Sequence, residues 1–312
     1  MAEKTVFKLK ELASQENVLA SGHGLCAGCS ESVIANQVMH AIGKPAVVAC
    51  ATGCLEVSTS RYPYTSWRAS WIHSAFENAA STISGVEAAY KAMVRKGRLE
   101  SRDLAFVVFA GDGATYDIGL QWLSGAVERG HRFLYVCLNN EGYMNTGIQA
   151  SGATIAGTWT TTTPVGSVRP GKVEWRKDMT AMMVDNGVLY AAQAAPHHWK
   201  DLMSKVKKAV EMDGPTFINI LAPCNRGWRY QAEDTIAMSR LAVETCVWPL
   251  FEVENGKWTI NNKPDKKPVR DWLESQGRFS HLLKPENASV VEQIQSRVDK
   301  EWDTLLKRAE QS

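Results

Sequence analysis

The chain has 312 residues, of which 45% are hydrophobic and 22% are charged, and its formal net charge is +2. A chain of this length can bury a large core without the help of a metal ion, as one large domain or two moderate ones. The small net charge gives no electrostatic reason to expect nucleic acid as a partner, and the apolar stretches have the length of strands, not of membrane spans.

The N-terminal segment MAEKTVFKLKEL has mixed charge and lacks the apolar stretch of a secretory signal. We therefore expect a cytoplasmic protein without a membrane anchor. Cysteines in such a protein are expected to be reduced thiols, ligands or core residues rather than disulfides. The seven cysteines are Cys26, Cys29, Cys50, Cys54, Cys137, Cys224 and Cys246.

Apolar helical segments alternate with short strand-like segments from about residue 30 to residue 222. Because the strands are apolar on both faces, we expect an α/β fold with a parallel sheet and helices on both faces. Ligands bind at the carboxyl ends of the strands in such sheets. The predicted helices are 31–42, 75–97, 116–130 and 197–212, and the predicted strands are 46–50, 104–111, 132–140 and 216–224.

Two later segments depart from this alternation. Residues 141–186 are rich in Gly, Thr and Ser, and so long a loop inside a compact domain is usually functional. After Cys224, residues 251–260 predict a hairpin and residues 287–309 an amphipathic helix. We predict that residues 225–312 form a C-terminal extension that packs on the core or on a partner subunit.

The strongest chemical signal is GDGATYDIG at residues 111–119, between a predicted strand and a predicted helix. Gly111 and Gly113 allow close approach of the backbone, and the start of a helix offers free amides to a phosphate. Asp112 supplies a carboxylate, Asn140 follows the next strand, and a backbone carbonyl comes from about Gly142. These three oxygens can share one cation, and Mg²⁺ prefers such ligands.

The GDGATYDIG segment, followed by NNEGYMNTG from Asn139 at the end of the next strand, resembles the thiamine diphosphate motif of the transketolase and 2-oxoacid decarboxylase superfamily. The resemblance implies that thiamine diphosphate binds here and that Asp112, Asn140 and the Gly142 carbonyl bind its Mg²⁺. The alternative is a fortuitous pair of turns at two strand ends.

Four of the cysteines are placed where they could bind one metal centre. Cys26 and Cys29 lie two residues apart in a glycine-rich loop, and Cys54 and Cys224 each follow a predicted strand. Four thiolates brought together in this way suit either a tetrahedral zinc ion or an iron–sulfur cluster. The spacing does not distinguish these two.

The order of the segments over about residues 20–230 resembles the β subunit of the pyruvate:ferredoxin oxidoreductase family, which includes oxalate oxidoreductases. The matching segments are Cys-x-x-Cys, ATGCLE, WIHSAFENAA, GDGATYDIG, NNEGYMNTGIQ, TTTTPVG and PCNRGW. The resemblance implies that residues 1–224 bind both thiamine diphosphate and a [4Fe–4S] cluster. The implied cluster ligands are Cys26, Cys29, Cys54 and Cys224.

The resemblance also assigns residues to the thiamine environment. It implies that Asn145 faces the reacting carbon as the catalytic residue. The implied cofactor-binding residues are Glu31, Thr52, Cys54, Gly111, Asp112, Gly113, Ala114, Asn140, Gly142 and Asn145.

The implied activity is oxidative decarboxylation of a small 2-oxoacid, with electrons passing through the nearby cluster to ferredoxin. The chain has room only for the diphosphate-binding domain and lacks a ferredoxin-type cysteine run. We therefore expect two partners besides ferredoxin: an α-type subunit with the pyrimidine-binding domain, and a ferredoxin-like cluster subunit or domain.

The substrate class remains open between pyruvate and oxalate. Ser58, Arg61, Arg68 and Tyr116 make the segments around the expected site more polar than a pyruvate-type pattern, which favours a dianion such as oxalate. The alternative is that the two arginines form ion pairs between subunits.

Two other functions are consistent with the residues. One is a non-redox thiamine-dependent lyase or synthase subunit with a structural zinc bound by four cysteines. The other is a binding module without chemistry, in which zinc holds a scaffold against a partner.

Overall fold

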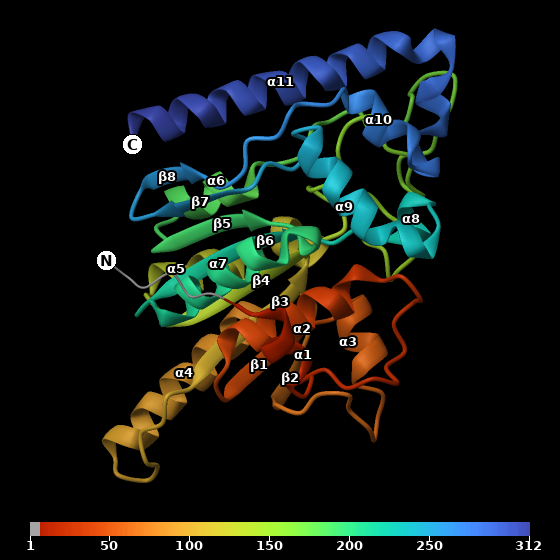
Figure 1. Ribbon diagram of the computed structural model, residues 1–312. Helices are drawn as coiled ribbons and strands as arrows, with labels where there is room; N and C mark the ends of the chain where they lie inside the picture. The colour runs from red at the N-terminus through yellow and green to blue at the C-terminus, as the bar shows by residue number, and fades with distance from the viewer. Residues whose placement is uncertain (1–6) are drawn as a thin grey trace.

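The computed structural model describes residues 7–312. The N-terminal segment that lacks the features of a secretory signal begins in residues 1–6, which lie outside this range. An eight-stranded sheet forms the centre of the fold, in the order β2-β1-β3-β4-β6-β5-β7-β8 (Figure 1). The strands are β1 (Ala46–Ala51), β2 (Ser70–Ser74), β3 (Ala105–Gly111), β4 (Phe133–Asn139), β5 (Tyr190–Ala194), β6 (Pro215–Leu221), β7 (Phe251–Glu254) and β8 (Lys257–Ile260).

The strands from β2 to β5 in this order all run parallel, which confirms the predicted α/β class. The predicted hairpin adds two antiparallel strands, because β7 pairs with β5 and β8 pairs with β7. The sequence did not predict β2 and β5. The β5 sequence, Tyr-Ala-Ala-Gln-Ala, has low strand propensity and becomes a strand through burial between β6 and β7.

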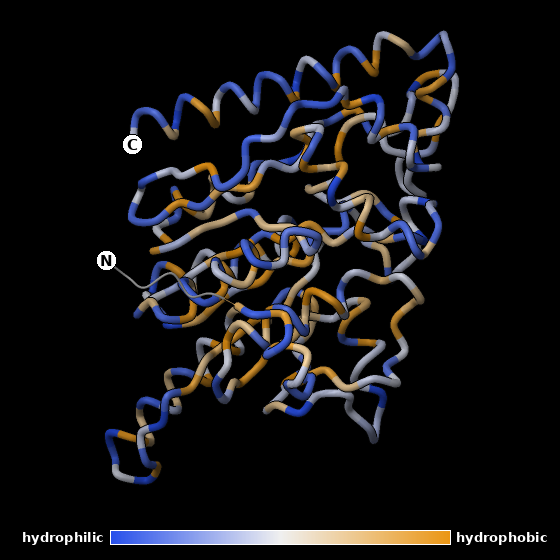
Figure 2. The backbone as a smooth tube through the Cα atoms, in the orientation of Figure 1, coloured by the Kyte–Doolittle hydropathy of each residue, from blue (hydrophilic) through white to orange (hydrophobic). Residues whose placement is uncertain are grey.

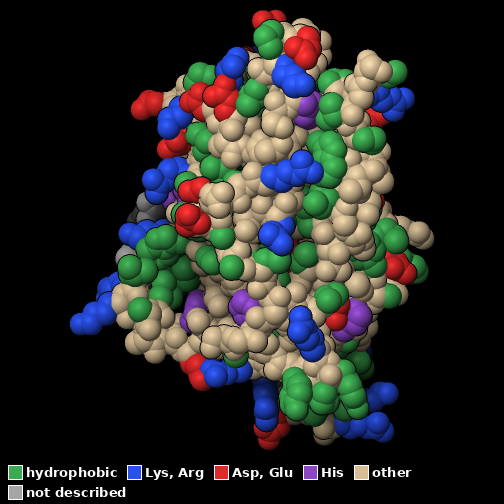
Figure 3. Space-filling view, turned by 90° about the vertical axis from the view of Figure 1, so that its right-hand side faces the viewer, with side chains coloured by type: hydrophobic (Ala, Val, Ile, Leu, Met, Phe, Trp, Pro, Cys, Tyr) green, Lys and Arg blue, Asp and Glu red, His purple; other side chains and the backbone are tan. Residues whose placement is uncertain are grey.

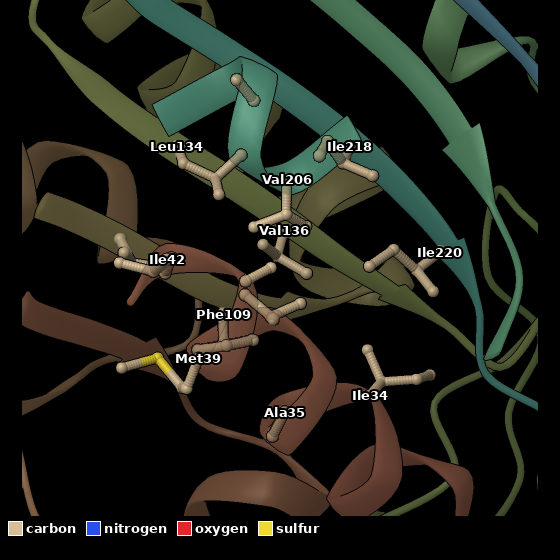
Figure 4. Packing of buried hydrophobic residues seen from close by; sticks show 14 of the residues in the cluster. Ile34, Ala35, Met39, Ile42, Phe109, Leu134, Val136, Val206, Ile218 and Ile220 are labelled. Atoms are coloured by element: carbon tan, nitrogen blue, oxygen red, sulfur yellow. The ribbon is translucent and has the colours of Figure 1, made fainter. Parts of the chain in front are cut away.

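Helices cover both faces of the sheet, as predicted. On one face α2 and α7 pack over β3, β4 and β6 in one hydrophobic cluster, in which Figure 4 shows Val206 next to Val136. On the other face α4, α5 and α6 cover a second cluster that includes Ile83, Leu123 and Met179. These helices are α2 (Ser30–Ile42), α4 (Ala79–Arg95), α5 (Leu120–Glu128), α6 (Met179–Asp185) and α7 (Trp199–Glu211).

Residues 225–312 supply β7 and β8 and four further helices. Their apolar side chains form a cluster around three fully buried tryptophans, Trp228, Trp248 and Trp272, which also contains Leu221 of β6. The last helix crosses above the hairpin in Figure 1, and Figure 2 shows hydrophilic and hydrophobic residues alternating along it. The boundary at residue 224 stays a prediction. The four helices are α8 (Asn225–Trp228), α9 (Thr235–Glu244), α10 (Val269–Glu274) and α11 (Ala288–Gln311).

Short elements complete the chain. A π-helical turn, η1, lies between β3 and α5, where the sequence predicted one continuous helix from residue 116. Residues 140–178 contain no regular helix or strand, as predicted for a functional loop, although α6 follows within the predicted range. The remaining elements are α1 (Leu9–Ala13), α3 (Cys54–Thr59), η1 (Gly113–Ile118), η2 (Pro196–His198), η3 (Ala232–Asp234), η4 (Gly277–Leu283) and η5 (Pro285–Asn287).

The parallel strands end on the right-hand side of Figure 1, where α3, α8 and the long loop meet. Figure 3 views the molecule from that side and shows Lys and Arg side chains dispersed over the surface. Within residues 7–312, none of the helices has both the length and the apolar character needed to cross a membrane.

Candidate active site

A cavity of about 140 Å³ lies where β1, β3 and β4 end. Its walls are mostly apolar and include Leu55, Phe76, Phe109 and Met144. Cavities at the carboxyl edge of a parallel sheet are the expected ligand sites of this class of fold. The predicted cofactor-binding residues among its lining are Glu31, Thr52, Cys54, Gly111, Gly113, Asn140, Gly142 and Asn145.

Asp112 and Ala114, the other two predicted residues, are buried beside this cavity and do not line it. The backbone amide of Asn140 donates to Asp112 Oδ1 at 3.1 Å, and the Ser151 hydroxyl donates to Asp112 Oδ2 at 2.5 Å. Burial raises the pKa of Asp112 to about 7, against the effect of both hydrogen bonds. A bound cation would offset this cost by favouring the ionised carboxylate.

Asn140 connects Asp112 to a second buried acid. Its side-chain amide donates to Glu31 Oε1 at 3.2 Å, and burial raises the pKa of Glu31 to about 7. Two acceptor atoms, Asn140 Oδ1 and Glu31 Oε2, are buried without a hydrogen-bond partner among residues 7–312. Unsatisfied buried oxygens are costly, and an absent ligand is one common reason for them. The Asn140 amide oxygen and the Asp112 carboxylate are oxygen ligands of the kind that Mg²⁺ prefers.

Close packing fixes the loop that follows Asn140. A Cβ atom at Gly113 would lie 2.4 Å from the Tyr143 ring, so this position has room only for glycine. The Tyr143 hydroxyl donates to the Gly113 carbonyl at 3.3 Å and to Asp117 at 3.1 Å. The Gly142 carbonyl, a predicted Mg²⁺ ligand, accepts from the Met144 amide at 3.0 Å. The loop therefore places Asn145 at the cavity wall.

A buried ion pair that the sequence analysis missed supports the same loop. Glu141 has a φ of 62°, a conformation that costs a non-glycine residue about 1–3 kcal/mol. The Arg278 guanidinium donates to Glu141 Oε2 at 2.6 Å, and both side chains are almost fully buried. The guanidinium also lies 4.1 Å from the centre of the Trp228 ring, whose indole N–H donates to the Asn140 carbonyl at 2.7 Å.

The C-terminal segment thus reaches the residues next to the predicted Mg²⁺ ligand. Arg278 lies 137 positions from Glu141 in the sequence, and it carries no local motif that would have identified it. Ser151 was likewise missed, although it lies in the long loop that the composition marked as functional.

Hydrogen bonds hold the cysteine-bearing segments together. Ser30 donates to the Pro223 carbonyl at 2.9 Å, and Thr235 donates to the Gly28 carbonyl at 2.5 Å. On the other side, the Gly24 amide donates to the Ser58 carbonyl at 2.7 Å. The Cys-x-x-Cys loop therefore lies between α3, which begins at Cys54, and the segment that carries Cys224.

The thiols influence one another but do not form a closed metal site. Burial, together with the charges of Glu31 and nearby cysteines, raises the pKa values of Cys29 and Cys54 far above their usual range. Burial also raises the pKa of Cys224, and the charge of Cys26 acts in the same direction. Within the described part of the chain, no three His, Cys, Asp or Glu side chains are arranged to hold a metal ion. The four thiols have the chemistry of cluster ligands, and the segments that carry them are adjacent.

The remaining cysteines, Cys50, Cys137 and Cys246, are buried, as expected for core thiols, although Cys50 also touches the cavity.

The polar residues that favoured oxalate, Ser58, Arg61, Arg68 and Tyr116, do not line the cavity, so they give no support to a dianionic substrate. Tyr116 is fully buried under the sheet edge, where Asn139 and Asn219 donate to its hydroxyl. Arg68 forms an ion pair with Glu16 at the surface. The Arg61 guanidinium packs against Gly24 in the cysteine loop.

Comparison with known proteins identifies the class of the domain. Residues 51–220 match the family described as thiamine pyrophosphate enzyme, C-terminal TPP binding domain. The fold also resembles a chain of the 2-oxoglutarate:ferredoxin oxidoreductase from Magnetococcus marinus, with a TM-score of 0.52 and 22% identity over 69% of this chain and 76% of that one. The fold and the cavity thus define a thiamine-diphosphate-type enzyme domain.

Curated relatives narrow the class. Pyruvate synthase subunit PorB of Thermotoga maritima is 48% identical, covering 95% of this chain and 94% of the relative. PorB of Methanocaldococcus jannaschii is 48% identical over 93% of this chain and 97% of the relative. Ketoisovalerate oxidoreductase subunit VorB of Pyrococcus abyssi is 41% identical, over 96% of this chain and 95% of the relative. The chain belongs to the β subunits of the 2-oxoacid:ferredoxin oxidoreductase family and is an oxidoreductase subunit.

Replacing Arg278 by alanine should lower the free energy of unfolding by about 3–5 kcal/mol, because the buried Glu141 carboxylate loses its hydrogen-bonded cation and keeps only the Arg176 guanidinium at 3.6 Å. The double variant Glu141→Gln/Arg278→Met should recover part of the loss. The control is Arg270→Ala, which removes an exposed ion pair with Glu274 and should change stability by less than about 1 kcal/mol. Denaturant unfolding followed by tryptophan fluorescence measures the three variants, and equal stability of Arg278→Ala and Arg270→Ala would contradict the role of the buried pair.

Proposed function

We propose that this chain binds thiamine diphosphate through Mg²⁺ and carries out the oxidative decarboxylation of a small 2-oxoacid. The observation that carries the proposal is the buried, unpartnered Asn140 Oδ1 next to the Asp112 carboxylate at the edge of the cavity. Asp112, Asn140 and the Gly142 carbonyl would hold the metal ion. The amides of Gly111 to Ala114, at the start of η1, would face the diphosphate.

Once bound, thiamine diphosphate supplies a carbon nucleophile for the 2-oxo carbon and accepts the electron pair left by carbon dioxide. This chain contributes the surroundings. Leu55, Phe76 and Phe109 exclude water from the cavity, and Asn145 offers an amide at its wall. Thr52, hydrogen-bonded to His73 at 2.8 Å, offers a hydroxyl on the other side. Glu31 holds the Asn140 side chain through its Oε1.

We further propose that Cys26, Cys29, Cys54 and Cys224 bind a [4Fe–4S] cluster that takes up the electrons one at a time and passes them towards ferredoxin. Cys54 supports this placement because it lines the cavity and its pKa responds to the charges of Cys26 and Cys224. A cluster bound here would be adjacent to the thiamine site. A structural zinc ion, the alternative, could not remove electrons.

The substrate that the relatives favour is pyruvate or a branched 2-oxoacid such as ketoisovalerate, since these are the substrates in the relatives' names. The mostly apolar cavity wall fits such a substrate better than a dianion. The partners in this proposal are an α-type subunit with the pyrimidine-binding domain, a ferredoxin-like cluster subunit or domain, and ferredoxin. The proposed location is the cytoplasm.

The variant Asp112→Asn should bind thiamine diphosphate in the presence of Mg²⁺ about tenfold or more weakly. Loss of a residue that only hydrogen-bonds to a metal ligand already lowers metal affinity by about tenfold or more, and loss of the charged ligand itself should cost at least as much. Isothermal titration of the assembled protein measures the affinity. Asp103→Asn, which changes an exposed aspartate paired with Lys44, is the control and should bind normally. Normal binding by Asp112→Asn would exclude the proposed magnesium site.

Serine at any of Cys26, Cys29, Cys54 or Cys224 should remove iron and visible colour from the anaerobically purified protein, which should otherwise contain roughly four iron atoms per copy of this chain beyond those of its partners. Cys246→Ala is the control, because it removes a buried cysteine that is not one of the four proposed ligands. One zinc ion in place of this iron would replace the redox proposal by the zinc alternative.

The substrate is tested with the assembled complex and a viologen acceptor. Pyruvate or 2-ketoisovalerate should reduce the dye in a reaction that requires coenzyme A, since the acyl group needs an acceptor. Oxalate should give no reduction. Dye reduction by oxalate without coenzyme A would overturn the assignment to the pyruvate class.

A further inference from the structure

A second and larger cavity, of about 240 Å³, lies between α11, the β7–β8 hairpin and the start of α6. It shares no lining residue with the first cavity. Figure 1 shows α11 running above the hairpin that borders it. Part of its lining is apolar and buried, including Trp248, Phe251 and Met179.

Four of the five cationic side chains that line this cavity have acidic partners. Lys177 pairs with Asp117, outside the lining, at 2.8 Å, and Arg176 lies near Glu141 and Glu301. Two carboxylates, Asp178 and Glu301, lie among the lining residues. Lys300 forms no ion pair with any residue between 7 and 312. Arg176 Nη1 is buried without a hydrogen-bond partner and lies 3.6 Å from Glu141 Oε1. The five cationic side chains of the lining are Arg176, Lys177, Arg297, Lys300 and Arg308.

We propose that this cavity binds a small organic anion with an aromatic or apolar body and a terminal phosphate or carboxylate. The apolar part would contact the body of the ligand, and the cations at the mouth would bind its charged end. The volume lies just below the usual range for ligand pockets, roughly 300–1,000 Å³, which fits a small ligand.

The competing interpretation is a cluster of surface ion pairs that only fastens α11 to the fold. Arg297 pairs with Glu301 at 3.0 Å, and Arg308 pairs with Asp178 at 3.5 Å. These two pairs use both carboxylates of the lining, yet Lys300 remains unpaired beside an open cavity. Among residues 7–312, Lys300 is thus the lining cation without an acidic partner, and it is the side chain that an anionic ligand would contact.

The geometry also connects this cavity to the first site. Arg176 Nη2 donates to the Val247 carbonyl at 2.5 Å and lies 3.7 Å from Glu301, whereas Nη1 lies 3.6 Å from Glu141 Oε1. Glu141 directly follows the proposed Mg²⁺ ligand Asn140. A ligand that draws Arg176 towards itself would weaken one of the two cationic contacts of Glu141. This connection, unlike the cavity itself, rests on the proposed function.

The test uses the assembled oxidoreductase complex and phenyl phosphate, which joins an aromatic ring to a dianion. Isothermal titration should show saturable binding, and inorganic phosphate and phenol should each bind more weakly than phenyl phosphate. Lys300→Glu should weaken binding by about tenfold or more, because it replaces an attractive charge by a repulsive one. Lys307→Glu, the same charge change at an exposed residue of α11 that does not line the cavity, should bind like the native protein.

Absence of saturable binding, or equal binding by the Lys300→Glu and Lys307→Glu variants, would overturn the proposed site. The connection to Glu141 has its own measurement. Phenyl phosphate should change the affinity for thiamine diphosphate in the native complex and in Lys307→Glu but not in Lys300→Glu, and an unchanged affinity in all three would overturn the connection alone. Asp112→Asn, which tests the thiamine site, should still bind phenyl phosphate, so failure of one proposal is distinguishable from failure of the other.

Discussion

The hydrogen bond from the Asn140 amide to the Asp112 carboxylate is the contact on which the rest of the site depends. It exists because β3 and β4 are parallel neighbours in a register that pairs Gly111 with Leu138, so that both strands end at the same level. Burial of Asp112 and Glu31 beside this contact raises both pKa values to about 7. The fold thus maintains two desolvated acids whose charge a bound cation would stabilise.

The C-terminal extension takes part in this arrangement. Arg278 and Trp228 reach the turn at Glu141 and Asn140 from segments that follow β6, the last parallel strand, in sequence. A buried ion pair is weak evidence for stability, because desolvation offsets much of its attraction. Its more direct consequence here is geometric: it holds Glu141 at a positive φ and thereby fixes the path of the chain from Asn140 to Gly142.

The cysteine segments and the cavity share one boundary. Cys54 begins α3 directly after β1, so that the same strand end contributes a cavity wall and one of the four thiols. The contacts Ser30 to Pro223 and Thr235 to Gly28 bring the remaining cysteine segments to this place. Contacts within the protein chain therefore place the proposed thiamine and cluster sites next to each other.

The sequence by itself determined the elements and motifs whose signals are local. The apolar strands β1, β3, β4 and β6, the glycines around Asp112 and the cysteine spacing follow from short-range patterns. Only the tertiary structure decided that Tyr116 and Arg68 do not line the cavity, that Ser151 and Arg278 support the site, and that the Ala-rich β5 is a strand. The physical reason is that these features depend on which distant segments pack together. The contact between Arg278 and Glu141 joins residues 137 positions apart, and no local sequence pattern predicts it.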